Sequence, residues 1–366
     1  MSPTIHPNRS IYDLDRHEWA ELLQGEPQYR IEQIWTGLYR QFSTPAELTN
    51  LPKKLRETLT EKLPPPLLVS QEQTTDDRKT IKWLFELPDG QQVETVLMRY
   101  RTRDTVCVSS QVGCAMGCGF CATGQAGFFR QLTSGEIIEQ VARASKRLKL
   151  LGGPERVSNV VFMGMGEPMA NYDAVTEAIT RLNSESNIGA RSFTVSTVGI
   201  VPGILKLADF PLQVNLAISL HAANNELRSE LVPINKTYPI EALMDAVERY
   251  LDSTSRRVSF EWAMMESVND SDADAEQLSE LASSVDAHVN LIPLNPTPGW
   301  PTRGSSMQRV REFQEVLAEN GVNATIRDTR GSDISAACGQ LANRTGQVGK
   351  GRRNVVVPSV SSHLPS

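Results

Sequence analysis

The first hundred residues change from a helical to a strand-like hydrophobic pattern. Apolar positions recur at helical spacing over residues 15–23, 29–38 and 51–63, and three consecutive prolines at 64–66 end the last segment. Alternation of apolar and polar residues then predicts strands over 80–87 and 92–100, joined across Asp89-Gly90, a dipeptide typical of hairpin turns. We therefore expect a small N-terminal helical module plus a β-hairpin over residues 1–98.

From about residue 105 short apolar strands alternate with amphipathic helices. The predicted strands cover residues 105–109, 157–163, 193–196, 214–219, 258–264, 289–293 and 324–327. The predicted helices cover 134–151, 172–183, 240–251, 273–285 and 307–320, and the first of them opens with a capping box of Thr133 and Glu136. Repeated strand–helix units predict a parallel sheet with helices outside. We expect an α/β fold, a partial (β/α)6 TIM-like barrel rather than a flat doubly wound sheet, over residues 99–342, followed by a basic C-terminal tail over 343–366.

Charge and hydropathy narrow the class of protein. The 366-residue chain has a formal net charge of −6, so it lacks the overall basic character of many nucleic-acid-binding proteins, although local clusters such as Arg99, Arg101 and Arg103 remain. No N-terminal stretch resembles a signal peptide, and no apolar run has the length needed to span a bilayer. We expect a cytoplasmic protein with no membrane partner, whose cysteines stay reduced.

Three of the five cysteines form the motif Cys114-Ala-Met-Gly-Cys118-Gly-Phe-Cys121, directly after the first predicted barrel strand. Three closely spaced thiolates suit a 4Fe-4S cluster in which one iron has no protein ligand. That iron can bind S-adenosylmethionine (SAM) through its amino and carboxylate groups, and one-electron reduction then releases a 5′-deoxyadenosyl radical. The alternative is a zinc cage that adds Cys107, but zinc motifs usually consist of two separated cysteine pairs.

Glycine and polar residues follow several predicted barrel strands. Gly166 permits a ligand to approach the backbone closely, and the carboxylate of Glu167 can accept hydrogen bonds from an ammonium group. Polar residues also end or follow three later strands: Ser196, Ser219, His221 and Asn295. Because the carboxyl ends of parallel strands meet at one edge of the sheet, these residues predict a ligand site there.

Two cysteines lie outside the three-cysteine motif. Cys107 falls inside an apolar strand, where a cysteine commonly serves as a small buried hydrophobic residue. Cys338 follows the last predicted strand, in a segment that we expect to be flexible, and a thiol there is more often reactive. Two such thiols can carry out nucleophilic attack and then resolution through a disulfide.

Together these segments resemble the RlmN/Cfr family of radical SAM RNA methyltransferases over nearly the whole chain. The landmarks occur in the family's order: Val93-Glu-Thr-Val96, Cys107-Val-Ser-Ser-Gln-Val-Gly-Cys114, the cysteine motif, Gly164-Met-Gly-Glu-Pro168, Ser219-Leu-His221, Pro233-Ile-Asn-Lys236 and Ala337-Cys-Gly-Gln-Leu341.

The resemblance implies a role for each candidate residue. Cys114, Cys118 and Cys121 would ligate the cluster. SAM would contact Gly166, Glu167, Ser196, Ser219, Leu220, His221 and Asn295. Cys338 would accept a methyl group from one SAM, and the radical from a second SAM would take hydrogen from it, so that two SAM molecules are used per turnover. The methylene radical would add to an adenine carbon, Glu94 would accept a proton, and Cys107 would release the product by forming a disulfide with Cys338.

The resemblance also implies the substrate. RlmN-type enzymes methylate C2 of an adenosine in the peptidyl-transferase centre of 23S rRNA and, in some bacteria, adenosine 37 of tRNA, whereas Cfr-type enzymes methylate C8 of that rRNA adenosine. Pro168 and the segment Pro293-Leu-Asn-Pro favour the RlmN type. We further expect a flavodoxin-like electron donor, RNA docking by the N-terminal module, and a monomer. A zinc-stabilised RNA-binding protein without catalysis is the alternative from another class.

Overall fold

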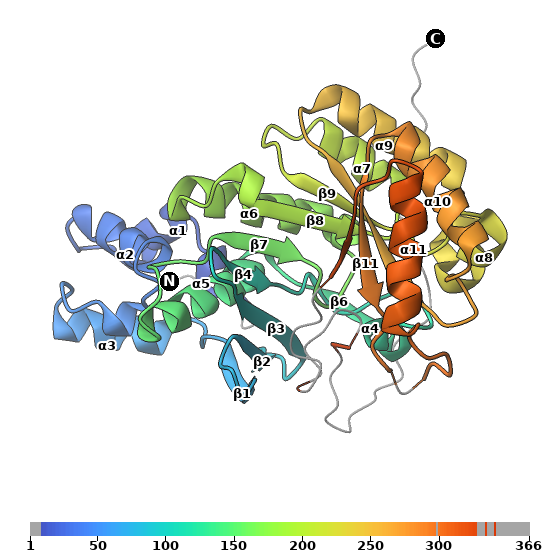
Figure 1. Ribbon diagram of the computed structural model, residues 1–366. Coiled ribbons are helices and arrows are strands. Elements are labelled where there is room, and N and C mark those ends of the chain that lie inside the picture. Colours follow the sequence, from blue (N-terminus) through green and yellow to red (C-terminus); the bar gives the residue numbers. More distant parts are fainter. Residues whose placement is uncertain (1–8, 298, 328–333, 335–339, 342–366) are drawn as a thin grey trace, which may run out of the picture.

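The N-terminal part of the chain is helical. The computed structural model describes residues 9–297, 299–327, 334, 340 and 341. The helices α1 (Arg16–Leu22), α2 (Tyr29–Tyr39) and α3 (Lys53–Lys62) lie together at one end of the molecule (Figure 1). Asp15 caps α1, because its side chain accepts a hydrogen bond from the backbone N–H of Glu18. The three helical segments predicted for this region are confirmed.

A sheet of ten strands runs through the described part of the chain, in the order β1-β2-β3-β4-β7-β8-β9-β10-β11-β12. Its first strands, β1 (Leu68–Thr74), β2 (Thr80–Glu86) and β3 (Gln92–Arg99), pair antiparallel, and β3 pairs antiparallel with β4 (Asp104–Cys107). The predicted hairpin of β2 and β3 is confirmed. The sequence pattern does not predict β1, because this edge strand is exposed along nearly its whole length and carries little apolar alternation.

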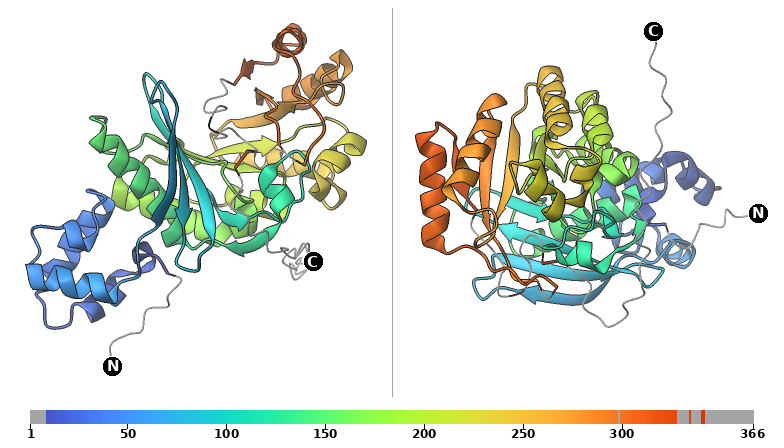
Figure 2. Two further views of the ribbon diagram at one scale, coloured as in Figure 1. Left: turned by 90° about the horizontal axis from the view of Figure 1, so that it is seen from below. Right: turned by 90° about the vertical axis from the view of Figure 1, so that its right-hand side faces the viewer.

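From β4 onward each strand pairs in parallel with the next one along the sheet. These strands are β7 (Asn159–Phe162), β8 (Phe193–Thr197), β9 (Asn215–Ser219), β10 (Val258–Met264), β11 (His288–Pro293) and β12 (Ala324–Ile326). The connecting helices are α5 (Ser134–Leu150), α6 (Tyr172–Ser186), α7 (Val201–Ala208), α8 (Asn225–Leu231), α9 (Ile240–Ser253), α10 (Asp272–Ser284) and α11 (Met307–Glu319). They cover the outside of the curved sheet (Figure 2). The predicted partial (β/α)6 barrel is confirmed, and the short helices α7 and α8 are additions to the prediction.

A second, two-stranded sheet follows β4. It consists of β5 (Gln111–Gly113) and β6 (Phe128–Gln131), and between them lie the cysteine motif and the short helix α4 (Ala122–Ala126). Gly113 has φ +73°, and a Cβ there would lie 1.9 Å from the carbonyl oxygen of Gly127, so only glycine fits. Strands of three and four residues are too short to be read from alternation.

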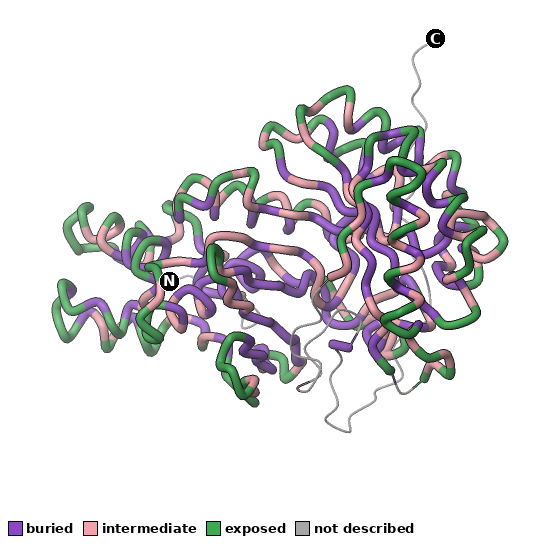
Figure 3. Tube along the Cα trace, viewed as in Figure 1, coloured by how far each residue is buried: buried purple, intermediate pink, exposed green. Residues whose placement is uncertain are grey.

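The helical module is fastened to the barrel through α5, which is buried along most of its length (Figure 3). Asp13 accepts hydrogen bonds from the Thr133 hydroxyl and the Gly135 N–H, each at 2.7 Å, at the start of α5. Further along α5, Glu139 accepts hydrogen bonds from the Ser10 hydroxyl and the Leu67 N–H. The sheet also continues across residue 98. The two regions therefore share a sheet and a helix, and the division into residues 1–98 and 99–342 stays a prediction.

The predicted basic tail, residues 343–366, lies outside the described residues. In the part of the chain that the structure does describe, none of the helices combines the length and apolar character required to cross a membrane.

Candidate active site

A cavity lies at the carboxyl ends of the parallel strands. It encloses about 1050 Å³ of space between atoms, and this value includes open solvent at its mouth. Most of the site residues predicted from the sequence line it: Cys114, Cys118, Cys121, Gly166, Glu167, Ser196, Ser219, His221 and Asn295. The structure therefore brings these polar residues together at this edge of the sheet, as the sequence predicted.

One residue predicted to contact SAM does not line the cavity. The Leu220 side chain is fully buried in the main apolar core and does not line the cavity. Its backbone N–H donates to the carbonyl of Glu261, and its carbonyl accepts a hydrogen bond from Arg228, so any contact with SAM would involve the backbone. Cys338 lies outside the described residues.

The cysteine loop presents its thiols to the cavity beside the apolar side chains of Met116 and Phe120. Burial raises the pKa of the Cys114 and Cys118 thiols, because apolar surroundings disfavour the charged thiolate unless a positive partner is present. Three thiolates at one cavity wall match the donor set of a 4Fe-4S cluster with one open iron. Among the described residues, no group of three or more His, Cys, Asp or Glu side chains is arranged to hold a single metal ion.

The segment after β11 and the short helix α4 hold the cysteine loop in place. Thr297 donates a hydrogen bond from its hydroxyl to the carbonyl of Phe120, and Gln125 donates to the carbonyl of Gly119 at 2.6 Å. A Cβ on Gly119 would lie 2.4 Å from the ring of Trp300, so the loop packs directly against this indole. These contacts order the loop without using the thiols.

Gly166 and Glu167 follow β7, and Glu167 reaches the end of β8 through a hydrogen bond. The Glu167 carboxylate accepts hydrogen bonds from the backbone N–H of Met169 at 3.0 Å and from that of Val198 at 2.9 Å. Burial raises the pKa of Glu167 to about 7, and these two N–H donors oppose that rise. A carboxylate has lone pairs for further donors, so the predicted acceptance of an ammonium group stays a prediction.

Gly166 is a position where glycine is required for two reasons. Its φ is +102°, and a Cβ would lie 2.5 Å from the Cβ of Gln111. We expect Gly166→Ala to lower the free energy of unfolding by roughly 2–4 kcal/mol, because strain and a backbone-level clash add. The measurement is chemical denaturation.

The matched control is Gly152→Ala, since Gly152 has φ +72° but nothing within 4 Å of the added carbon. This control should lose only about 1 kcal/mol. Equal losses in the two variants would contradict the packing argument.

His221 is held as a neutral hydrogen-bond donor. Its ring is buried, its Nδ1 accepts a hydrogen bond from the backbone N–H of Ala263 at 3.0 Å, and its ring contacts Phe120 edge-on. Burial, together with the nearby charge of Arg228, lowers the pKa of His221 to about 3. At neutral pH the proton therefore resides on Nε2, which leaves a neutral N–H at the cavity wall.

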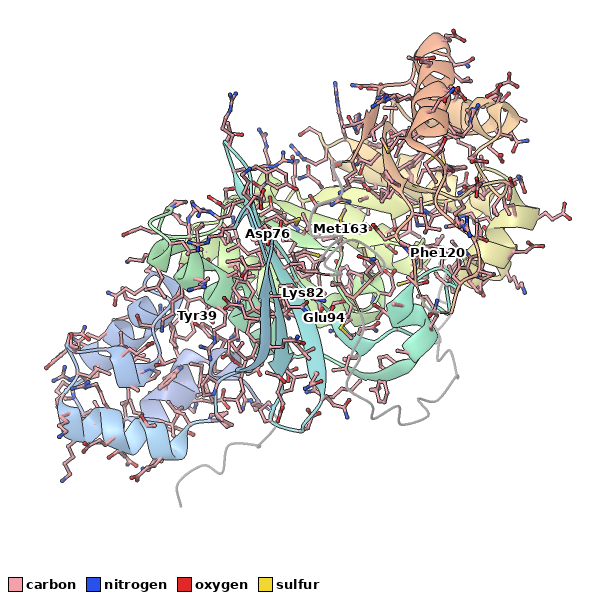
Figure 4. The ribbon with its side chains drawn as sticks, turned by 60° about the horizontal axis from the view of Figure 1, so that its bottom comes forward. Tyr39, Asp76, Lys82, Glu94, Phe120 and Met163 are labelled. Atoms are coloured by element: carbon pink, nitrogen blue, oxygen red, sulfur yellow. The ribbon has the colours of Figure 1, made fainter. Side chains whose placement is uncertain are left out.

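Glu94 and Cys107 do not line this cavity, but they share one face of the same ten-stranded sheet. Strand β3 pairs with β4 so that Val96 lies opposite Cys107, and Glu94 is two residues before Val96 on the same face. On β2, Lys82 lies opposite Val96, and its Nζ is 3.5 Å from a carboxylate oxygen of Glu94 (Figure 4). Both side chains are buried. The sequence interpretation missed Lys82, although a lysine inside a largely apolar strand was a usable signal.

A second charged pair at the cavity was also missed. Arg327, next to the end of β12, lies 3.3 Å from a carboxylate oxygen of Glu261 on β10, and both residues line the cavity. Glu261 accepts a further hydrogen bond from Asn290 at 2.8 Å. A glutamate in the middle of an apolar strand was again the available signal.

The fold and the cysteine cavity define a class of protein. A family model described as the radical SAM superfamily matches residues 108–278, which include the cysteine loop and most of the barrel. The protein is therefore a radical SAM protein.

Curated relatives identify the family within this class. The chain is 48% identical over 98% of its length, and over 97% of the relative, to a probable dual-specificity RNA methyltransferase RlmN of Chloroflexus aurantiacus. A protein with the same description from Geobacillus kaustophilus is 47% identical over 93% of this chain and 94% of its own. A crystal structure of a radical SAM methyltransferase from Sphaerobacter thermophilus has a TM-score of 0.87 and 50% identity, covering 91% of this chain and 98% of that one. The chain belongs to the RlmN family of radical SAM RNA methyltransferases, which confirms the resemblance.

Proposed function

We propose that this protein methylates C2 of an adenosine in 23S rRNA, and adenosine 37 of tRNA, through an S-methylcysteine intermediate. The observation that carries the proposal is the meeting of three cysteine thiols with Gly166, Glu167 and other polar strand ends at one cavity. Relatives that match nearly the whole chain are named dual-specificity RNA methyltransferases, which supports both substrates.

Cys114, Cys118 and Cys121 would hold a 4Fe-4S cluster that, with SAM bound, supplies a 5′-deoxyadenosyl radical by one-electron cleavage of SAM. The cavity's polar residues would orient SAM. Glu167, already fixed by two backbone donors, accepts hydrogen bonds from the ammonium group of SAM, and His221 donates from its neutral ring. Ser196 and Ser219, whose hydroxyl oxygens lie 3.3 Å apart on β8 and β9, bind polar groups of the same ligand.

Cys338, Cys107 and Glu94 would carry the transfer itself. Cys338 takes the methyl group of one SAM as a thioether, and a second SAM is used to remove one hydrogen atom from it, so that the methylene carbon can bond to adenine C2. Glu94 accepts the proton that leaves C2. The thiolate of Cys107 then attacks the sulfur of Cys338, and the carbon–sulfur bond breaks with its electron pair passing to the methylene carbon, which takes up a proton to become the methyl group. The unpaired electron of the adduct would return to the oxidised cluster, and a disulfide remains. The shared face of Glu94 and Cys107 supports this division of roles.

RNA docking would involve part of the basic surface. Lys146, Arg147 and Lys149 on α5 each pair with a glutamate, so this cluster is largely neutralised. Arg101 and Arg103, in the turn between β3 and β4, are exposed and are better placed to meet phosphates. We further propose a monomer that acts in the cytoplasm and receives electrons from a flavodoxin-like donor.

Mass spectrometry of the modified nucleoside tests the proposal. Anaerobically reconstituted protein, incubated with SAM, a reductant and a 23S rRNA fragment or a tRNA anticodon stem-loop, should yield 2-methyladenosine in both RNAs. Formation of 8-methyladenosine would contradict the C2 assignment and indicate a Cfr-type reaction. A colourless protein with stoichiometric zinc and no methylation would overturn the enzymatic proposal altogether.

A further inference from the structure

Arg228 on α8 is a fully buried arginine, with an exposed fraction of 0%. Its Nε donates to the carbonyl of Leu220 at 3.2 Å, and its terminal nitrogens donate to the Val198 carbonyl at 2.6 Å and the Asn235 side-chain oxygen at 2.7 Å. All of these acceptors are neutral. None of the ion pairs between described residues includes Arg228. A buried guanidinium without an anionic partner is costly, so its charge calls for compensation.

Arg228 lies directly behind the wall of the cavity that the cysteine loop lines, because Val198, whose carbonyl it binds, is part of that wall. Leu227 and Leu231, on either side of Arg228 in α8, pack in one apolar cluster with Met116 and Cys118. Burial lowers the pKa of Arg228 only to about 10, so the guanidinium stays protonated at neutral pH.

The surrounding sequence fixes the guanidinium in position. Asn235, which is 2% exposed, donates from its side-chain nitrogen to the Ser229 hydroxyl at 2.9 Å and to the backbone carbonyl of Asn225 at 3.2 Å. This arrangement turns the Asn235 side-chain oxygen toward Arg228. The segment Pro233-Ile-Asn-Lys236 therefore has a physical role that the reaction scheme left unassigned. With hydrogen bonds to the loops after β8 and β9, Arg228 is locked beside the site rather than free to reach a ligand.

We propose that Arg228 is the fixed counter-charge of the iron–sulfur cluster and raises its reduction potential. The inference rests on the proposed function only in taking Cys114, Cys118 and Cys121 as the cluster ligands. Reduction adds a negative charge at the cluster, and a fixed positive charge in a medium of low dielectric constant favours the reduced form. Arg228 acts through this charge and makes no contact with substrate, so it is a tuning residue rather than a catalytic one.

Redox titration of the reconstituted cluster, followed by electron paramagnetic resonance, tests the proposal. Arg228→Gln and Arg228→Met remove the charge, whereas Arg228→Lys keeps it. Asn235→Ala keeps the charge but removes one hydrogen bond, and so reports disorder alone. We expect the neutral variants to shift the midpoint potential to more negative values, making reduction roughly tenfold less favourable. Arg228→Lys and Asn235→Ala should stay close to wild type.

Iron content, measured before each titration, separates the two proposals. A wild-type protein that takes up no cluster would contradict the proposed function. Loaded variants whose potentials all equal that of wild type would overturn the role of Arg228 alone. If the two neutral variants fail to load iron while Arg228→Lys and Asn235→Ala load fully, the counter-charge role is supported. Failure of Arg228→Lys and Asn235→Ala to load as well would show a purely structural role and overturn it.

Discussion

A Cys107→Ala variant is expected to accumulate as a covalent protein–RNA adduct, with most of the active protein trapped after one turnover. In the proposed scheme nothing else attacks the sulfur of Cys338, so without the Cys107 thiolate the bond between its methylene group and adenine should persist. Cys107 is 6% exposed and shares a sheet face with Glu94. The adduct is measured as an RNase-sensitive band of reduced mobility on a denaturing gel.

The second cysteine of the scheme provides the control. Cys338→Ala should give neither methylated RNA nor adduct, and the Cys107→Ala, Cys338→Ala double variant should behave in the same way. Multiple turnovers by Cys107→Ala, or methylation by Cys338→Ala, would show that the two-cysteine scheme is wrong.

Replacing Cys118 with alanine is expected to remove the cluster and to reduce methylation to background. Cys118 is the buried member of the motif, and two remaining thiolates leave a second iron without a protein ligand. Wild-type protein should be brown, with about four irons per chain and absorption at about 400 nm. The variant should be colourless and should no longer cleave SAM.

Met116→Leu is the matched control for Cys118→Ala. Met116 is buried in the same loop, and this swap preserves side-chain volume at a cost of less than about 1.5 kcal/mol. It should therefore retain the iron. Loss of iron from this control to the same extent would mean that loop packing, rather than the thiolate, decides cluster retention.

The barrel was largely predictable because its strands are apolar, regularly spaced and separated by amphipathic helices. The predicted strand over 258–264 is identical to β10, and the Thr133–Glu136 capping box marks the start of α5 as expected. The missed elements lack such signals. Helix α8 has only seven residues and includes the buried Arg228, so its sequence reads as polar and loop-like.

The candidate site divides in the same way. The cysteine motif and Gly166-Glu167 are local patterns, so the sequence alone identified them. Lys82 and Arg327 act through partners on other strands, and their pairing with Glu94 and Glu261 depends on the register of the sheet. Arg228 is harder still to identify from the sequence. Only the folded structure shows that its guanidinium is buried and has no carboxylate partner. Burial and register are tertiary properties that periodicity does not encode.

Along the main sheet, the strands lie in the same order in which the ribosome synthesises them. Apart from β5 and β6, each strand described lies beside the one made just before it, from β1 to β12. A chain emerging from the ribosome can therefore add strands one at a time to an existing edge, without leaving a gap for a later strand to fill. The face that carries Lys82, Glu94 and Cys107 is complete once β4 has joined, before most of the cofactor cavity has been translated. The strand order thus permits assembly from the N-terminus, and β12, the last described strand, forms the far edge of the sheet.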